Sequence, residues 1–151
     1  MKIYVDRIPE EGLLLEAEEP PRIIDIGETQ EKFKDNIYVR IRAFKVSGNL
    51  IVTGSLSTHV QLACSRCLDQ FLYLIDNKQF SYDCEILDRD IIDLTEPIRE
   101  DMIVGLPIRP LCREDCKGLC GQCGQNLNLG ECGCKKDSRS SGPFSVLDDL
   151  L

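Results

Sequence analysis

The stretch from residue 111 to residue 134, LCREDCKGLCGQCGQNLNLGECGC, holds six of the nine cysteines of the chain. Thiolates at such short spacing either ligate a soft metal ion, above all zinc, or carry out redox chemistry. A Cys-x2-Cys turn presents two sulfurs to one ion, and CGQCG places glycines where such turns need a positive φ. Because the stretch has no long apolar run of its own, we expect its fold to be organised around metal.

The compartment decides whether these thiols form disulfides. The N-terminal MKIYVDRIPEEG is charged from its second residue and lacks the apolar core of a secretory signal peptide. No window approaches the roughly 18 apolar residues that a membrane span requires. These features predict a cytoplasmic protein without a membrane segment, where clustered cysteines bind metal or do redox work and structural disulfides are rare.

The cysteines fall into four close pairs and one single residue: Cys64 with Cys67, Cys112 with Cys116, Cys120 with Cys123, Cys132 with Cys134, and Cys84 alone. Eight thiols are enough for two zinc ions, each held by four cysteines. Redox thiols and an iron–sulfur cluster are the alternatives to structural zinc. A zinc site of this type can contribute on the order of 10 kcal/mol to the folding of its segment.

The assignment of the pairs to two sites is open at this level. CGQC and CGC are separated only by GQNLNLGE, whose Asn and Gly residues suit a reversing turn, so these four thiols can close one site locally. Cys112 and Cys116 would then join Cys64 and Cys67, which is the grouping we favour. In the alternative, Cys112, Cys116, Cys120 and Cys123 form one site, and Cys64 and Cys67 depend on the CGC pair.

Cys84 and His59 also have reactive side chains, but for both we expect a structural position rather than a chemical role. Cys84 lies in KQFSYDCEI, where alternate residues are apolar, and is predicted to be a small buried residue on the inner face of a strand. His59, the only histidine, alternates with Val60 and Leu62 and is expected to point outward, as neither ligand nor base.

The remaining sequence predicts an α+β fold with an antiparallel sheet of four to six strands and one or two short helices. Residues 36–86 alternate with period two, SGN at 47–49 predicts a turn, and CSRC is expected at the tip of a hairpin. Thr95 is the predicted N-cap of a helix that ends near Gly105, and PFSVLDDLL from Pro143 predicts a short tail helix.

This organisation divides the chain into three parts. Residues 1–110 are expected to form the mainly antiparallel β domain, with its CxxC hairpin turn and one helix. Residues 111–136 should form the zinc-binding segment packed on it. Residues 137–151 are predicted to be a linker and the C-terminal helix.

The charge distribution weighs against general binding of nucleic acid. The formal net charge is −8, and two four-thiolate zinc sites would add about four further negative charges. The stretches that carry the thiols are the mildly basic ones, and joining Cys64 and Cys67 to Cys112 and Cys116 would bring Arg66, Arg113 and Lys117 together. The acidic first 35 residues could dock a basic partner or form a solvated edge of the domain; we favour the edge.

Several motifs together resemble the YceD family of large ribosomal RNA subunit accumulation proteins. They are a CxRC turn after an alternating strand, the segment PLCREDCKGLCGQCGQNLN with CxC behind it, and PF-x-VL-x-x-L at the end. The resemblance covers about residue 36 to the C-terminus. It implies a role in the accumulation of large-subunit rRNA, implies that Cys64, Cys67, Cys112 and Cys116 form one unit, and supplies no catalytic residues.

The favoured function is therefore a non-catalytic zinc-binding factor in ribosome biogenesis. Its expected partners are a ribosomal protein or an rRNA-processing factor, with direct RNA contact weak by charge and no membrane or small-molecule substrate. The alternative is a redox-sensing zinc protein that releases a partner on oxidation. An enzyme is disfavoured, because eight thiolates would fill both metal sites and no acid–base constellation stands out.

Overall fold

The computed structural model describes residues 1–24, 33–86 and 91–134. A four-stranded antiparallel sheet has the order β2 (Leu13–Glu19), β3 (Ile37–Val46), β4 (Asn49–Ala63) and β5 (Gln70–Glu85). A second sheet pairs β1 (Lys2–Tyr4) with β6 (Ile91–Asp93). Two short 3₁₀ turns, η1 (Val5–Arg7) and η2 (Pro21–Ile23), and one helix, α1 (Thr95–Val104), complete the regular elements of the described residues. The predicted α+β class with antiparallel strands is confirmed.

The sheet has one buried and one open face, which follows from the alternation in the sequence. Every second residue of β3 from Ile37 to Ala43 is buried, and the residues between them are exposed. In β4 the same pattern buries Leu50 and Val52, shifts at an irregularity between Gly54 and Leu56, and resumes afterwards. Such alternation is expected where an antiparallel sheet packs its core on one side only.

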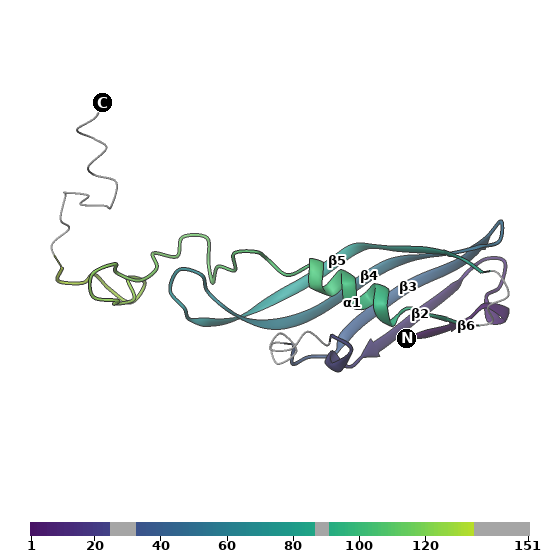
Figure 1. Ribbon diagram of the computed structural model, residues 1–151, viewed down its shortest axis with the longest axis horizontal. Helices are drawn as coiled ribbons and strands as arrows, with labels where there is room; N and C mark the ends of the chain where they lie inside the picture. The colour runs from purple at the N-terminus through teal and green to yellow at the C-terminus, as the bar shows by residue number, and fades with distance from the viewer. Residues whose placement is uncertain (25–32, 87–90, 135–151) are drawn as a thin grey trace, which may run out of the picture.

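The helix α1 covers part of this buried face (Figure 1). Its side chains Ile98 and Met102 are fully buried and belong to the same core cluster as the inward residues of the strands. The predicted cap was one position off, because the helix begins at Thr95 itself. Asp93 accepts hydrogen bonds from the Thr95 N–H (2.9 Å) and hydroxyl (2.6 Å), and these bonds lower the pKa of the Asp93 carboxyl.

Two hairpin turns connect the long strands where the sequence predicts them. Ser47 and Gly48 have φ values of 49° and 85°, as a two-residue turn between right-twisted strands requires. The pairing of β3 with β4 ends at Ser57, whereas the pairing of β4 with β5 continues to Ala63 and Gln70. The β4–β5 ribbon therefore extends beyond β3 and carries residues 64–69 at its end (Figure 1).

Residues 1–24 belong to the domain. β2 pairs along its whole length with β3, and β1 pairs with β6. Ile3, Val5 and Ile8 are buried in the common core. The described part of the acidic N-terminal region is thus an edge of the fold, as we favoured, and its carboxylates lie on that edge.

After α1 the chain continues to the cysteine-rich segment at one end of an elongated molecule (Figure 1). The bounds of the three predicted parts of the chain stay a prediction, and the predicted C-terminal helix lies outside the described residues. No helix among the residues that the structure describes is long and apolar enough to cross a membrane.

Candidate metal centres

Eight cysteine sulfurs gather into two groups of four. The first cluster consists of Cys64, Cys67, Cys112 and Cys116, and the second cluster of Cys120, Cys123, Cys132 and Cys134. Within each cluster all four sulfurs lie within 4.8 Å of one another. This is the grouping that the local turn argument favoured, and the alternative, with residues 112, 116, 120 and 123 together, is not the one formed.

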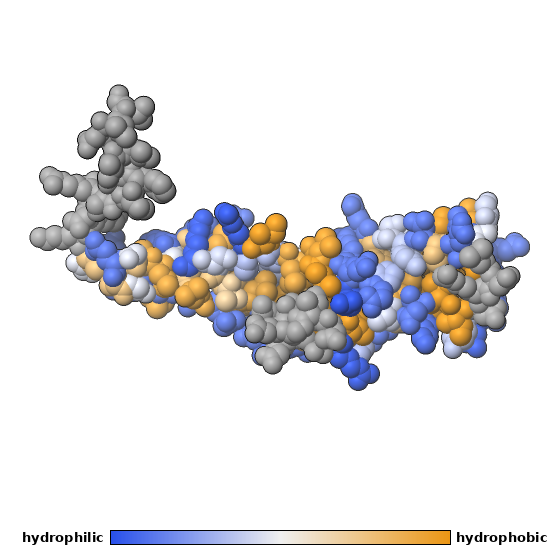
Figure 2. Space-filling model, viewed as in Figure 1, coloured by the Kyte–Doolittle hydropathy of each residue, from blue (hydrophilic) through white to orange (hydrophobic). Residues whose placement is uncertain are grey.

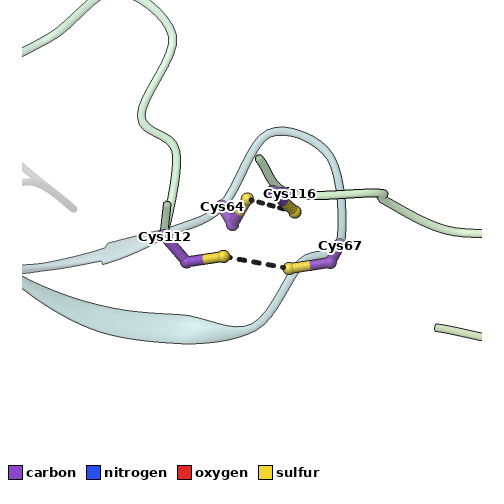
Figure 3. Close-up of side chains that lie close together, drawn as sticks. All are labelled: Cys64, Cys67, Cys112 and Cys116. Carbon is purple, nitrogen blue, oxygen red and sulfur yellow. Dashed lines mark hydrogen bonds between the residues drawn. The ribbon is translucent and has the colours of Figure 1, made fainter. Parts of the chain in front are cut away.

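The first cluster joins the sheet to the C-terminal part of the chain. Cys64 and Cys67 stand in the turn at the end of the β4–β5 ribbon, and Cys112 and Cys116 approach from the segment after α1 (Figure 3). The Sγ atoms of Cys64 and Cys116 are 3.7 Å apart, and those of Cys67 and Cys112 are 3.6 Å apart. Four sulfurs placed tetrahedrally at the usual Zn–S distance would be about 3.8 Å apart.

Burial strengthens the metal interpretation of the first cluster. Cys64, Cys67 and Cys116 are almost fully buried, with Phe71 and Leu111 packed against them. Four thiolates in a dry site repel one another, so a cation must compensate their charge if they are to be ionised. All nine cysteines, which lie within the described ranges, are free thiols. The donor set and the spacing therefore fit one tetrahedral ion.

Backbone N–H groups around the CSRC turn face the sulfurs. Arg66 N–H donates to Cys64 Sγ at 3.5 Å, and Leu68 N–H donates to the Cys64 carbonyl at 2.9 Å. Leu68 takes a left-handed φ of 64°, which lets the short turn close. Burial raises the pKa of the Cys64 thiol, but donors of residues 112, 67 and 66 outweigh it and bring that pKa to about 6.

The pKa values of the other three thiols in the first cluster are shifted in different directions. The pKa of Cys116 is lowered, first of all by the hydrogen bond from the Asn128 amide. Burial raises the pKa of Cys112. The backbone hydrogen bond at Asp69 lowers the pKa of Cys67, but burial and the neighbouring thiols outweigh it, so that pKa is raised. Without a metal the cluster therefore shares protons among its sulfurs, and a bound cation would replace them.

The second cluster is built by the chain around itself. Cys120 N–H bonds the Gln125 carbonyl at 2.8 Å, and Gly124 N–H bonds the Cys120 carbonyl at 2.9 Å, which shapes the CGQC turn. Backbone donors of Cys123 and Gln122 lower the pKa of Cys120 to about 6, and the Cys123 thiol is the main reason that the pKa of Cys134 rises to about 12. Cys123 is exposed and the other three thiols are half-buried.

Arg66 has a role that sequence reasoning missed. Its guanidinium Nη1 donates to the carbonyls of Cys116 (2.9 Å) and Glu114 (3.5 Å), so it ties the hairpin turn to the C-terminal segment. Arg113 in turn pairs with Asp115 at 3.4 Å. Of the three bases expected to gather here, Arg66 and Arg113 are thus engaged with carbonyls and a carboxylate of the protein itself, which leaves less positive charge for contact with RNA.

The predicted outward orientation of His59 agrees with the structure, whereas Cys84 is less buried than predicted. His59 points to the open face of the sheet, where its Nδ1 lies 3.3 Å from a carboxylate oxygen of Asp35. Cys84 is half-buried, packs against the main core and belongs to neither cluster. Asn126 and Asn128, which support the clusters as described below, were missed individually; their only signal in the sequence was the turn-forming character of GQNLNLGE.

The fold and the two clusters define a small, mainly antiparallel β protein with two candidate four-cysteine metal centres. The model of the family described as "Large ribosomal RNA subunit accumulation protein YceD" matches residues 76–151, half of the chain. This chain belongs to the YceD family. The match contains six of the eight clustered cysteines, while Cys64 and Cys67 precede it.

Curated relatives come from mycobacteria and a plant. An uncharacterised protein of Mycobacterium tuberculosis is 31% identical over 102 residues, which cover 58% of this chain and 49% of that protein. One from Mycobacterium leprae is 29% identical over 107 residues, 60% of this chain and 49% of its own. This chain therefore spans about half the length of these relatives.

The Arabidopsis thaliana protein named "Large ribosomal RNA subunit accumulation protein YCED homolog 1, chloroplastic" is 35% identical over 51 residues, 34% of this chain and 16% of that protein. No solved structure matches the chain significantly.

Proposed function

We propose that this protein is a non-catalytic factor that binds two zinc ions and supports the accumulation of large-subunit rRNA during ribosome biogenesis in the cytoplasm. The observation that carries the proposal is the family match over residues 76–151, which includes six of the eight clustered thiols. Zinc is the proposed metal because four thiolates with tetrahedral spacing suit it and leave no open position for catalysis. Cys64, Cys67, Cys112 and Cys116 would hold one ion, and Cys120, Cys123, Cys132 and Cys134 the other.

Contacts with protein are favoured over contacts with the phosphate backbone of RNA. Exposed apolar side chains stand on each segment that carries or precedes a cluster: Leu68 in the hairpin turn, Ile108 before Cys112, and Leu129 between the second cluster's two pairs. On the face shown in Figure 2, hydrophobic and hydrophilic residues alternate along the length of the molecule. With Arg66 engaged and a formal charge of −8, an apolar contact to a ribosomal protein or rRNA-processing factor is the better fit.

Depletion of the protein tests the biological role. The ratio of large-subunit to small-subunit rRNA should fall, and it should recover when the wild-type chain is supplied again. A Cys116→Ser variant, which removes a buried thiol of the first cluster, should fail to restore the ratio. Cys84→Ala is the matched control, because it removes the cysteine outside both clusters and should restore it. An unchanged ratio on depletion would refute the role in rRNA accumulation.

The exposure of the second cluster favours one other function, a redox sensor. Because Cys123 is exposed and its three neighbours are half-buried, an oxidant can reach these sulfurs. A sensor would lose zinc from the second cluster at peroxide concentrations that leave the first cluster intact. Zinc content and alkylation of free thiols after mild peroxide measure this, and full retention of both ions would dispose of the redox function.

A further inference from the structure

A small hairpin connects the two clusters. Residues 117–128, here called the linking hairpin, are held by an antiparallel bridge between Leu119 and Asn126 and by a 2.9 Å bond from Leu127 N–H to the Gly118 carbonyl. The CGQC turn of the second cluster forms its closed end. Its open end lies beside Cys116 of the first cluster. A change in the conformation of the linking hairpin at the second cluster would therefore also shift the residues beside Cys116.

Asn128 makes the contact at the open end. Its side-chain Nδ2 donates to Cys116 Sγ at 3.3 Å, and its Oδ1 accepts a bond from Lys117 N–H at 2.8 Å. The amide is held in this orientation by Asn126, whose Oδ1 accepts from both the backbone and the side chain of Asn128. An N–H bond to a sulfur stabilises its thiolate form, which is the form that ligates metal.

Two more bonds attach the linking hairpin to the turn that holds Cys64 and Cys67. Leu119 N–H donates to the Arg66 carbonyl at 3.1 Å, and Asn126 Nδ2 donates to the Asp69 carboxylate at 2.8 Å. Gly118 makes this approach possible, since it has a φ of +75° and an added Cβ would lie 3.1 Å from the Arg66 carbonyl oxygen. The linking hairpin thus braces both chain segments of the first cluster.

We propose that Asn128 is a positioning residue that couples the two metal centres, so that an ion in the second cluster tightens binding of the ion in the first. Filling the second cluster closes the linking hairpin and holds the Asn128 amide against Cys116. By linkage, an ion in the first cluster strengthens binding in the second by the same factor. This inference rests on the proposed binding of metal by both clusters.

The test uses the full chain loaded with zinc and titrated with a chelator. Native mass spectrometry counts the ions, and alkylation shows which thiols have been released. Asn128→Asp keeps an oxygen for Lys117 N–H but removes the amide that donates to Cys116 and to Asn126, and it adds a negative charge. Asn128→Ala removes all three side-chain contacts of this residue without adding a charge, so a loss shared by both variants follows from the missing amide donor. Gln125→Ala is the control, because that side chain is exposed and its backbone carbonyl stays in place.

We expect both Asn128 variants to weaken zinc binding in the first cluster by about tenfold or more, which is the usual effect of losing a residue that orients a metal ligand. The Gln125 variant should behave as wild type. Cys123→Ser, which opens the second cluster, should weaken the first cluster to a similar extent. The double variant Cys123→Ser with Asn128→Ala should show little further loss, because both changes remove the same coupling. Amide exchange in β3 confirms that each variant keeps its sheet.

The outcomes separate the coupling from the proposal on which it rests. A wild-type chain that binds no zinc in either cluster would refute metal binding altogether. The coupling alone would be refuted if the wild-type chain binds two ions and the Asn128 variants hold zinc in the first cluster as tightly as the wild-type chain does. Additive losses in the double variant would also refute it.

Discussion

The two clusters have the same four-cysteine composition but depend on different parts of the protein. The first cluster is buried and joins segments 45 or more residues apart, since Cys67 meets Cys112 and Cys64 meets Cys116. The second is half-exposed and closes within residues 120–134. In the first, hydrophobic packing by Phe71 and Leu111 supports the sulfurs. In the second, a bound ion would supply most of the folding energy, because few apolar side chains accompany it.

Removal of metal is the strongest way to expose this difference. With chelator, residues 120–134 should lose all ordered structure, because the energy lost there is on the order of 10 kcal/mol and nothing replaces it. The sheet core should persist, since its buried residues in β3 and β4 do not depend on a metal. Amide hydrogen exchange mapped along the chain measures both regions. Equal loss of protection in β3 would show that the clusters support the whole fold.

Matched single substitutions should separate the clusters next. Cys67→Ser removes a buried thiol at the end of the β4–β5 ribbon and should cost one zinc and lower the thermal unfolding midpoint by several degrees. Cys123→Ser should also cost one zinc, but with a smaller change in that midpoint, because its exposed cluster lies outside the core. Zinc counting and calorimetry measure the two effects. The comparison fails if both variants shift the midpoint equally.

The smallest expected effect concerns Arg66. Arg66→Ala removes the guanidinium bonds to the carbonyls of Cys116 and Glu114 and should cost about 1 kcal/mol of unfolding free energy, while both zinc ions stay bound. Denaturant titration measures it. Arg109→Ala, on the segment before Cys112, is the control for loss of a nearby positive charge. If Arg66→Ala instead abolished contact with RNA at unchanged stability, the tethering role of Arg66 would be wrong.

Much of the fold could be predicted because its signals are local. Alternating residues identify β3, β4 and β5, and Ser47 with Gly48 identifies the turn between two of them. The start of α1 was predicted one residue late, because Thr95 is the first helical residue and the Asp93 carboxylate accepts its N–H. An aspartate in a short strand and a threonine two residues later satisfy the same capping preference, and only the backbone path distinguishes them.

For the clusters, too, local features could be predicted from the sequence and long-range contacts could not. The set of eight cysteines follows from the sequence, and the short loop between CGQC and CGC favoured the local closure of the second cluster, whereas the grouping itself is decided by the structure. The roles of Arg66 and Asn128 do not follow from spacing. Each depends on a partner brought near by packing: Arg66 reaches a carbonyl 50 residues away, and Asn128 reaches a sulfur across a hairpin.

By itself, then, the sequence determined which thiols this protein has, which strands surround them and where the turns fall, since periodicity and spacing act over a few residues. Only the tertiary structure decided that β2 completes the four-stranded sheet, that Arg66 ties two segments together and that Asn128 touches Cys116. These contacts join distant parts of the chain. Their geometry depends on how the β4–β5 ribbon, α1 and the linking hairpin pack, and no local pattern encodes that packing.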